Sequence, residues 1–73
     1  MTDQVLDMRL KLCPLPVIKT QQAIASMGPG EVLTVICTDP GATHDIPAWC
    51  RVHGHELVSI ETTDDEFYIR VAC

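Results

Sequence analysis

One cysteine stands immediately before two prolines that are spaced for the start of a helix. The sequence reads Cys13-Pro14-Leu15-Pro16, and a segment of helical periodicity follows it. Proline has a helical φ and no N–H group, so Pro14 suits the first helical position and Pro16 is tolerated in the first turn. Cys13 is therefore predicted at or beside the N-cap, where a thiolate accepts N–H bonds at the positive end of the helix dipole. We expect the amides of Leu15 and Val17 to be the free donors nearest to its sulfur.

Positive charge is concentrated around the same cysteine. Arg9, Lys11 and Lys19 are three of the five cationic residues, in a chain whose net charge is −5. No acidic residue occurs between positions 8 and 30. Cations near a thiol lower its pKa below the free value of about 8.5, so Cys13 is predicted to be a reactive thiolate. The alternative is that Cys13 is a small apolar residue that happens to precede a proline-capped helix.

Few kinds of thiol chemistry suit so small a chain. A protease-type nucleophile needs a histidine base, an orienting residue and a substrate cleft, whereas His44, His53 and His55 all fall around the predicted second helix. A dithiol redox enzyme needs a nearby resolving cysteine, and the sequence contains no C-x-x-C. Carrying sulfur as a persulfide needs only an exposed nucleophilic sulfur and a docking surface. This function is therefore favoured for Cys13, without a cofactor.

Six elements are expected to position the thiol, in the order βαβαββ. Alternating or β-branched apolar residues predict strands, and a 3.6-residue period predicts helices. The predicted segments are a strand at 6–12 that runs into an extended loop, a helix that starts at Pro14 and continues through 17–27 to Gly28-Pro29-Gly30, a strand at 32–37, a helix from about 43–45 to Gly54, and strands at 57–62 and 67–71. One right-handed parallel crossover then places both helices on one face of a four-stranded mixed sheet. The fold class is an α/β two-layer sandwich, with residues 1–73 forming a single domain.

The apolar pattern also predicts which side chains face the core. On the first helix, one face carries Val17, Ile18, Gln21, Ile24 and Ala25. On the second helix, the buried stripe is Ile46, Trp49, Cys50 and His53, with Pro47 restricted to the first turn. In the final hairpin, the inward residues are Phe67, Ile69 and Val71.

Composition and charge exclude several classes of protein. A net charge of −5 and a pI near 4.8 argue against binding to a nucleic-acid backbone. No apolar run approaches the roughly 18 residues of a membrane span, and Asp3 and Asp7 stand where a signal peptide would be basic. The expected location is the cytoplasm, where the four cysteines stay reduced and form no disulfide framework.

The other cysteines and histidines have weaker functional interpretations. Cys50-x-x-His53-x-His55 resembles part of a metal site, but a structural zinc takes four ligands and packing explains two of these three. No metal is therefore predicted. Cys37 ends a buried strand and is expected to be a core residue. Cys73 is the last residue, and either acts as a second relay thiol or is incidental.

Several segments together resemble the TusA (SirA-like) family of sulfur carriers. They are Leu6-Asp7-Met8-Arg9, Cys13-Pro14-Leu15-Pro16-Val17-Ile18, Asp39-Pro40, Asp45-Ile46-Pro47 and Gly54-His55-Glu56-Leu57. The resemblance covers nearly the whole chain and implies the same two-layer βαβαββ fold, with Cys13 as the cysteine that bears the persulfide. It further implies a sulfur donor that is a cysteine desulfurase or a rhodanese-like protein, and acceptor proteins with reactive cysteines. Asp45 matches a family acid and is a candidate docking residue.

The resemblance has further implications and one departure. Such carriers serve tRNA thiolation, cofactor sulfuration or sulfur oxidation. Many members have glycine where this chain has Leu10, so the loop before Cys13 is expected to differ in shape. The alternative function is a non-catalytic adaptor or regulator that uses the basic face around Cys13 to bind an acidic partner. Replacing Cys13 by serine would spare an adaptor and abolish a carrier.

Overall fold

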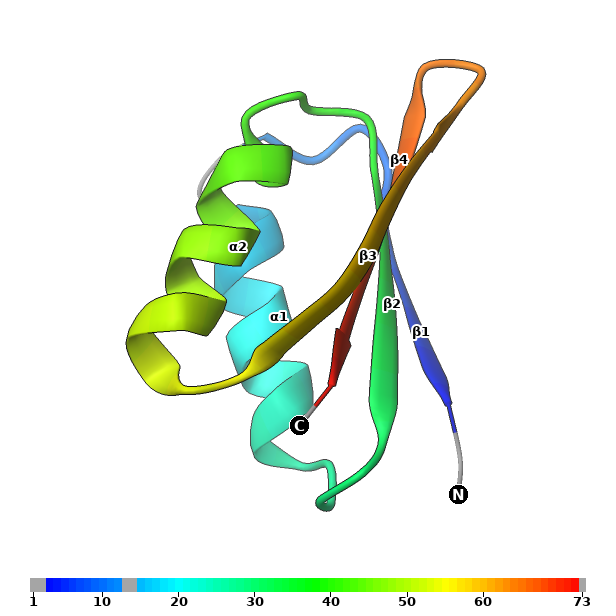
Figure 1. Cartoon of the computed structure of the whole chain (residues 1–73). Helices are drawn as coiled ribbons and strands as arrows, with labels where there is room; N and C mark the ends of the chain where they lie inside the picture. The colour runs from blue at the N-terminus through cyan, green and yellow to red at the C-terminus, as the bar shows by residue number, and fades with distance from the viewer. Residues whose placement is uncertain (1–2, 13–14, 73) are drawn as a thin grey trace.

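Four strands and two helices form a sandwich of two layers (Figure 1). A computed structural model describes residues 3–12 and 15–72. The elements are β1 (Gln4–Met8), α1 (Leu15–Ala25), β2 (Val32–Cys37), α2 (Ala42–His53), β3 (Glu56–Thr63) and β4 (Glu66–Ala72). The sheet order is β1-β2-β4-β3, in which β1 and β2 are parallel and the other pairs are antiparallel. Both helices lie on the same face of the sheet, which confirms the predicted fold class.

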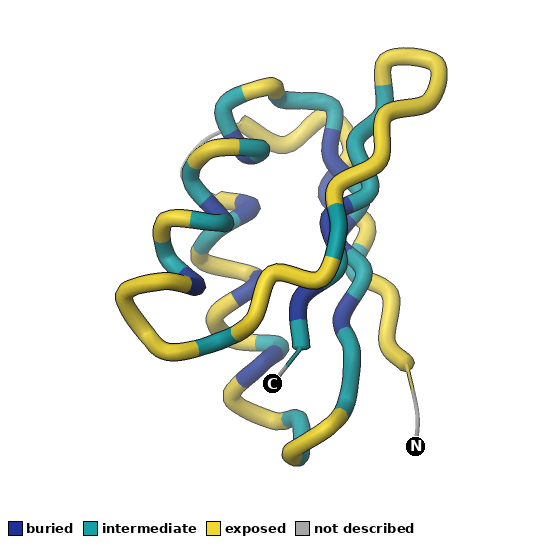
Figure 2. Tube along the Cα trace, in the orientation of Figure 1, coloured by how far each residue is buried: buried dark blue, intermediate teal, exposed yellow. Residues whose placement is uncertain are grey.

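The core lies between the sheet and the helices, where alternate residues of the two central strands are buried (Figure 2). The fully buried residues of these strands are Leu33, Val35, Cys37, Ile69 and Val71. Ala42, Ile46 and Cys50 from α2 also belong to the core, as do Met8 from β1 and Ile24 from α1. Phe67 pairs with Cys37 across the sheet but is only half-buried, because it lies close to the exposed hairpin turn. Period-two alternation thus places the strand side chains as the sequence predicts.

The buried face of α1 differs from the predicted one. Its buried residues are Pro16, Thr20 and Ile24, and Val17 is half-buried. Ile18, Gln21 and Ala25 are exposed, although the predicted face placed all three inward. Thr20 can be buried because its hydroxyl donates to the Pro16 carbonyl oxygen at 2.7 Å, which leaves no unsatisfied polar group.

The C-terminal end of α1 also differs from the prediction. The helix ends at Ala25, and the amides of Ser26 and Met27 close its last turn with i→i−3 bonds. Gly28 therefore does not cap the helix directly. Its amide donates to Glu31 Oε2 at 3.0 Å and helps to turn the chain into β2.

Helix α2 begins earlier than predicted. Its N-cap is Gly41, and Pro47 lies in the second turn instead of the first. Bonds of the i→i+3 type over residues 39–44 wind the chain before Pro47 is reached. The end at Gly54 is confirmed: its φ is 77°, and its amide donates to the Cys50 carbonyl.

The hairpin of β3 and β4 closes in a two-residue turn. Asp64 and Asp65 have φ values of 49° and 66°. Positive φ at both central residues is typical of the type I′ turn, whose twist matches that of antiparallel strands. The turn brings Glu66, the first residue of β4, to the end of the sheet where β1 finishes.

Candidate functional site

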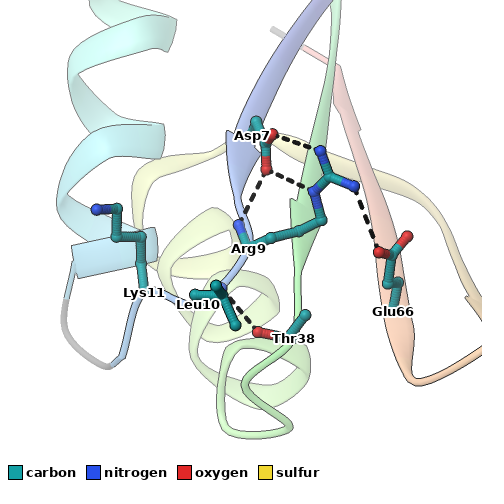
Figure 3. Close-up of a pocket in the computed structure, with 6 residues that line it drawn as sticks. All are labelled: Asp7, Arg9, Leu10, Lys11, Thr38 and Glu66. Carbon is teal, nitrogen blue, oxygen red and sulfur yellow. Dashed lines mark hydrogen bonds and ion pairs between the residues drawn. The ribbon is translucent and has the colours of Figure 1, made fainter.

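The candidate site lies at the end of the sheet where the parallel strands β1 and β2 both finish. A shallow depression of about 540 Å³ occupies this edge (Figure 3). It is lined by Asp7, Arg9, Leu10, Lys11, Thr38 and Glu66. The loop that runs from it leads toward α1, and Cys13 and Pro14 lie outside the described residues. Their predicted roles at the helix cap therefore stay predictions.

Arg9 does not act as a free cation at this site. Its Nη2 lies 2.8 Å from Asp7 Oδ2, and its Nε and backbone N also donate to Asp7 Oδ1, at 3.0 and 3.1 Å. Its Nη1 lies 3.4 Å from Glu66 Oε2. These bonds lower the pKa of Asp7 to about 2 and raise the pKa of Arg9. The predicted cluster of three cations therefore reduces to Lys11 and Lys19.

The network of Asp7, Arg9 and Glu66 also includes Tyr68 on β4. The Tyr68 hydroxyl donates to Glu66 Oε1 at 2.9 Å. This hydrogen bond to a carboxylate, and the negative charge itself, raise the pKa of Tyr68. Glu66 thus connects Arg9 at the end of β1 with Tyr68, which lies two residues along β4 on the same face of the sheet.

The loop after β1 turns sharply at Leu10. Leu10 has a φ of 65°, in the left-handed region that favours glycine. Its amide donates to Thr38 Oγ1 at 2.9 Å, and the Lys11 amide donates to the Met8 carbonyl at 3.2 Å. The prediction that the strand pattern continues as an extended chain through Leu10 and Leu12 was wrong, since both side chains project into solvent. A glycine would adopt this backbone conformation without strain.

The start of α1 is partly as predicted. Leu15 is its first described residue, and Pro16 lies in the first turn and is buried. The prediction that the Leu15 amide is a free donor was wrong, because it donates to the Leu12 carbonyl at 3.0 Å. Lys19 is exposed on the same helix.

The two described cysteines are structural. Cys37 and Cys50 are buried, which confirms that both side chains face the core. Burial, together with the charge of Asp39, raises the pKa of Cys37 to about 11. Burial also raises the pKa of Cys50. Neither thiol is a candidate nucleophile, and Cys73 lies outside the described residues.

The histidines near the end of α2 pack around a tryptophan. The rings of His53 and His55 lie 4.9 and 5.1 Å from the Trp49 ring, and His55 is stacked on it. Trp49 is half-buried against the core, and His53 is exposed, contrary to its predicted place in the buried stripe. In residues 3–12 and 15–72, no three histidine, cysteine or acidic side chains form a metal-binding group.

Two further findings concern the surface. Asp45 lies in the first turn of α2 and is half-buried. Neither described helix has the length and apolar character needed to cross a membrane.

Comparison with known proteins identifies the family. The family model described as "Sulfurtransferase TusA" matches residues 4–72. The chain belongs to the TusA family of sulfurtransferases. Two proteins of Neisseria meningitidis, from serogroups A and B, are 41% identical over 71 residues, which cover 97% of this chain and 96% of theirs. A Bacillus subtilis protein is 39% identical over 64 residues, which cover 88% of this chain and 83% of its own. The names of all three propose a sulfur-carrier role for them.

A solved structure confirms the fold of the TusA-family chain. The crystal structure of a SirA-like protein from Desulfitobacterium hafniense superimposes with a TM-score of 0.86 over 96% of both chains, at 21% sequence identity. At the site itself, sequence reasoning missed Thr38 and Glu66. The position of Thr38 could have been predicted, because residues that follow two neighbouring parallel strands lie at the same edge of a sheet. Glu66 has no comparable local signal.

Proposed function

We propose that this protein is a carrier-type sulfurtransferase that holds sulfane sulfur as a persulfide on Cys13. The observation that supports this function best is the TusA family match over residues 4–72, which includes the Cys13-Pro14-Leu15-Pro16 motif. Burial of Cys37 and Cys50 is consistent with it, because a carrier thiol must reach the thiols of partner proteins. The cytoplasm is the proposed location, and no cofactor or metal is required.

The proposed reaction consists of two sulfur transfers that balance without an oxidant. In the first, the Cys13 thiolate attacks the outer sulfur of a donor persulfide, the donor S–S bond breaks, and the donor cysteine leaves as a thiolate. In the second, an acceptor thiolate attacks the outer sulfur of the Cys13 persulfide. The acceptor then holds the persulfide, and Cys13 is released as a thiolate. Each step exchanges one S–S bond for another, as in thiol–disulfide exchange.

The charges beside the motif support an activated thiol. Lys11 and Lys19 flank Cys13 in the sequence, and α1 directs the positive end of its dipole toward its first residues. Both effects lower the pKa of a neighbouring thiol and so increase its thiolate fraction at neutral pH. Pro14, Leu15 and Pro16 set the start of the helix in this proposal. Arg9 contributes less than its sequence position indicates, since two carboxylates compensate its charge.

The proposed partners are proteins at both ends of the transfer. The donor is a cysteine desulfurase or a rhodanese-like protein, and the acceptor is a protein with a reactive cysteine. The pathways open to such a carrier are tRNA thiolation, cofactor sulfuration and sulfur oxidation. Asp45 is proposed as a docking residue, and no nucleic acid or membrane binds directly.

Mass spectrometry after incubation with sodium polysulfide tests this function. One added sulfur on the peptide that contains Cys13, removed by reductant and absent from Cys13→Ser, is the expected result. Cys73→Ser is the matched control and should load normally. Sulfur on the Cys73 peptide instead would move the active thiol to the C-terminus. No added sulfur on any cysteine would favour the adaptor alternative, in which Cys13→Ser retains full partner binding.

A further inference from the structure

Four large apolar side chains are exposed where the loop after β1 leads into α1. They are Leu10, Leu12, Leu15 and Ile18, with 87%, 71%, 42% and 42% of their surface exposed. We name these four residues the leucine collar. An exposed apolar cluster of this kind marks a protein interaction surface more often than a single exposed leucine does.

The backbone keeps the members of the leucine collar close to one another. The Leu15 amide donates to the Leu12 carbonyl at 3.0 Å, so these two residues lie close together. Ile18 lies three residues after Leu15 on α1, and such positions share one helix face. Leu10 is fixed at the other end by its hydrogen bond to Thr38 Oγ1. Leu12, Leu15 and Ile18 therefore lie near one another, and in the sequence the four collar residues flank Cys13 on both sides.

Positive charge without a compensating acid borders the leucine collar. Lys11 and Lys19 form no ion pair with any residue in 3–12 or 15–72, whereas Arg9 and Arg70 are both paired with carboxylates. Figure 3 shows that Lys11 extends toward α1, away from Glu66. Lys19 lies four residues after Leu15, on the same exposed face of α1. The net charge of the whole chain is −5, so this positive border contrasts with the remaining surface.

We propose that the leucine collar, with Lys11 and Lys19, is the surface on which sulfur-exchanging partners dock. The inference rests on the proposed function and specifies the chemistry of the partner segment: a reactive cysteine flanked by apolar side chains and bordered by acidic ones. Apolar contact excludes water around the two sulfurs, and opposite charges orient the segment and select against wrong partners. Donor and acceptor must use the same surface, since both reach the one sulfur on Cys13.

Three synthetic cysteine peptides test the proposal with the intact protein. One carries glutamate and leucine around its cysteine, one carries lysine and leucine, and one carries glutamate and serine. Cys13 is first loaded with sodium polysulfide, which needs no docking surface, and sulfur transfer to each peptide is followed. We expect the glutamate–leucine peptide to react about tenfold faster than either other peptide at low salt, with the advantage over the lysine peptide declining as salt rises.

Variants of the collar separate docking from thiol reactivity. For each variant, the rate of sulfur transfer to a peptide is divided by the rate of transfer to dithiothreitol, so a change in the reactivity of Cys13 itself cancels. Lys11→Glu with Lys19→Glu should reverse the preference between the glutamate and lysine peptides. Leu12→Ser should remove the advantage of the leucine peptide. The matched controls are Arg51→Glu, at an exposed cation that lacks an ion pair among the described residues, and Val52→Ser, at a side chain that is 78% exposed on α2. Both controls should keep the wild-type preference.

The outcomes distinguish the two proposals. Equal relative rates for all three peptides, with normal loading of Cys13, would contradict the proposed docking surface and leave the carrier function in place. The docking surface would also be contradicted if the collar variants and the control variants changed the relative rates equally. Failure of Cys13 to hold sulfur overturns the carrier function, and this inference with it.

Discussion

Arg9 Nη1 lies 3.4 Å from Glu66 Oε2, although 57 positions separate the two residues in the sequence. The contact joins the end of β1 to the start of β4, across the end of the central strand β2. Because Arg9 also binds Asp7 through its side chain and its backbone, it braces the point from which the loop toward Cys13 departs. Its role in the structure is therefore to position the loop more than to supply charge.

Arg9→Gln should raise the pKa of Asp7 from about 2 toward 3.8. The side-chain hydrogen bonds from Arg9 are the largest cause of the lowered pKa and are lost with the guanidinium, whereas the bond from the backbone amide of residue 9 remains. A carboxylate with a lowered pKa stabilises the fold above its unfolded-state pKa, and this contribution is lost as pH falls through the folded-state value. Wild-type protein should therefore lose this contribution below about pH 4. Carboxyl ¹³C NMR titration measures the pKa directly.

Arg70→Gln is the control for this titration. Arg70 pairs with Glu61 on β3 and has no contact with Asp7. Its replacement should leave the Asp7 titration where it is in the wild type. A wild-type Asp7 that titrates near 3.8 would contradict the bidentate pair.

Leu10→Gly should stabilise the protein by up to about 1 kcal/mol. The left-handed conformation costs an L-residue roughly 1–2 kcal/mol, and the greater chain entropy of glycine in the unfolded state offsets part of that gain. The Leu10 side chain is almost fully exposed, so its removal leaves no cavity. Urea unfolding measures the difference.

Leu12→Gly provides the contrast. Leu12 is also exposed and apolar but is not among the described residues with positive φ. Glycine there should destabilise the fold by about 0.5–1 kcal/mol through unfolded-state entropy. Equal effects at positions 10 and 12 would mean that the turn at Leu10 carries no strain.

Cys37 should make the protein less stable as pH rises from 9 toward 11. Its folded-state pKa is about 11, against an ordinary value of 9.0, because the thiolate would be buried near Asp39. The unfolded chain then loses its proton first, and stability falls across that interval. Denaturant midpoints at several pH values test this effect, and Cys37→Ala should show a smaller decline. Rapid alkylation of Cys37 by iodoacetamide in the native protein at pH 8 would contradict its burial.

Thr20→Val should destabilise the fold by about 0.5–1.5 kcal/mol, although valine has nearly the same shape. The lost interaction is the buried hydrogen bond from Thr20 Oγ1 to the Pro16 carbonyl. Thr62→Val, at an exposed position on β3, is the control and should change stability little. A neutral Thr20→Val would show that the hydroxyl is dispensable and that volume alone determines this face of α1.

The fold was predictable because its strands and helices carry regular apolar patterns. Val35 belongs to a continuous apolar, β-branched segment and Ile69 to an alternating one, and each pattern predicts a strand with a buried face. The face of α1 was less predictable, because Thr20 is buried only through its bond to a backbone carbonyl. Apolarity alone contains no signal for such a residue.

The site was predictable only where its signal is local. The motif at Cys13 combines residue type and spacing within four positions, so it is visible in the sequence. The pairing of Arg9 depends on Glu66, whose approach depends on the register of three strands and on the turn at Asp64 and Asp65. No local pattern predicts a contact of that kind. A positive charge counted from the sequence is therefore not always a positive charge available to a thiol.

The position of β4 affects how the protein is made in the cell. This strand comes last among the described elements, yet it lies in the interior of the sheet between β2 and β3. During translation, β1 and β2 can pair early, but the sheet cannot close until Ala72 has emerged from the ribosome. Until then β2 presents an unpaired apolar edge, which is the kind of surface that chaperones bind and that aggregates. Nascent chains stalled before β4 should therefore be sensitive to protease along their whole length.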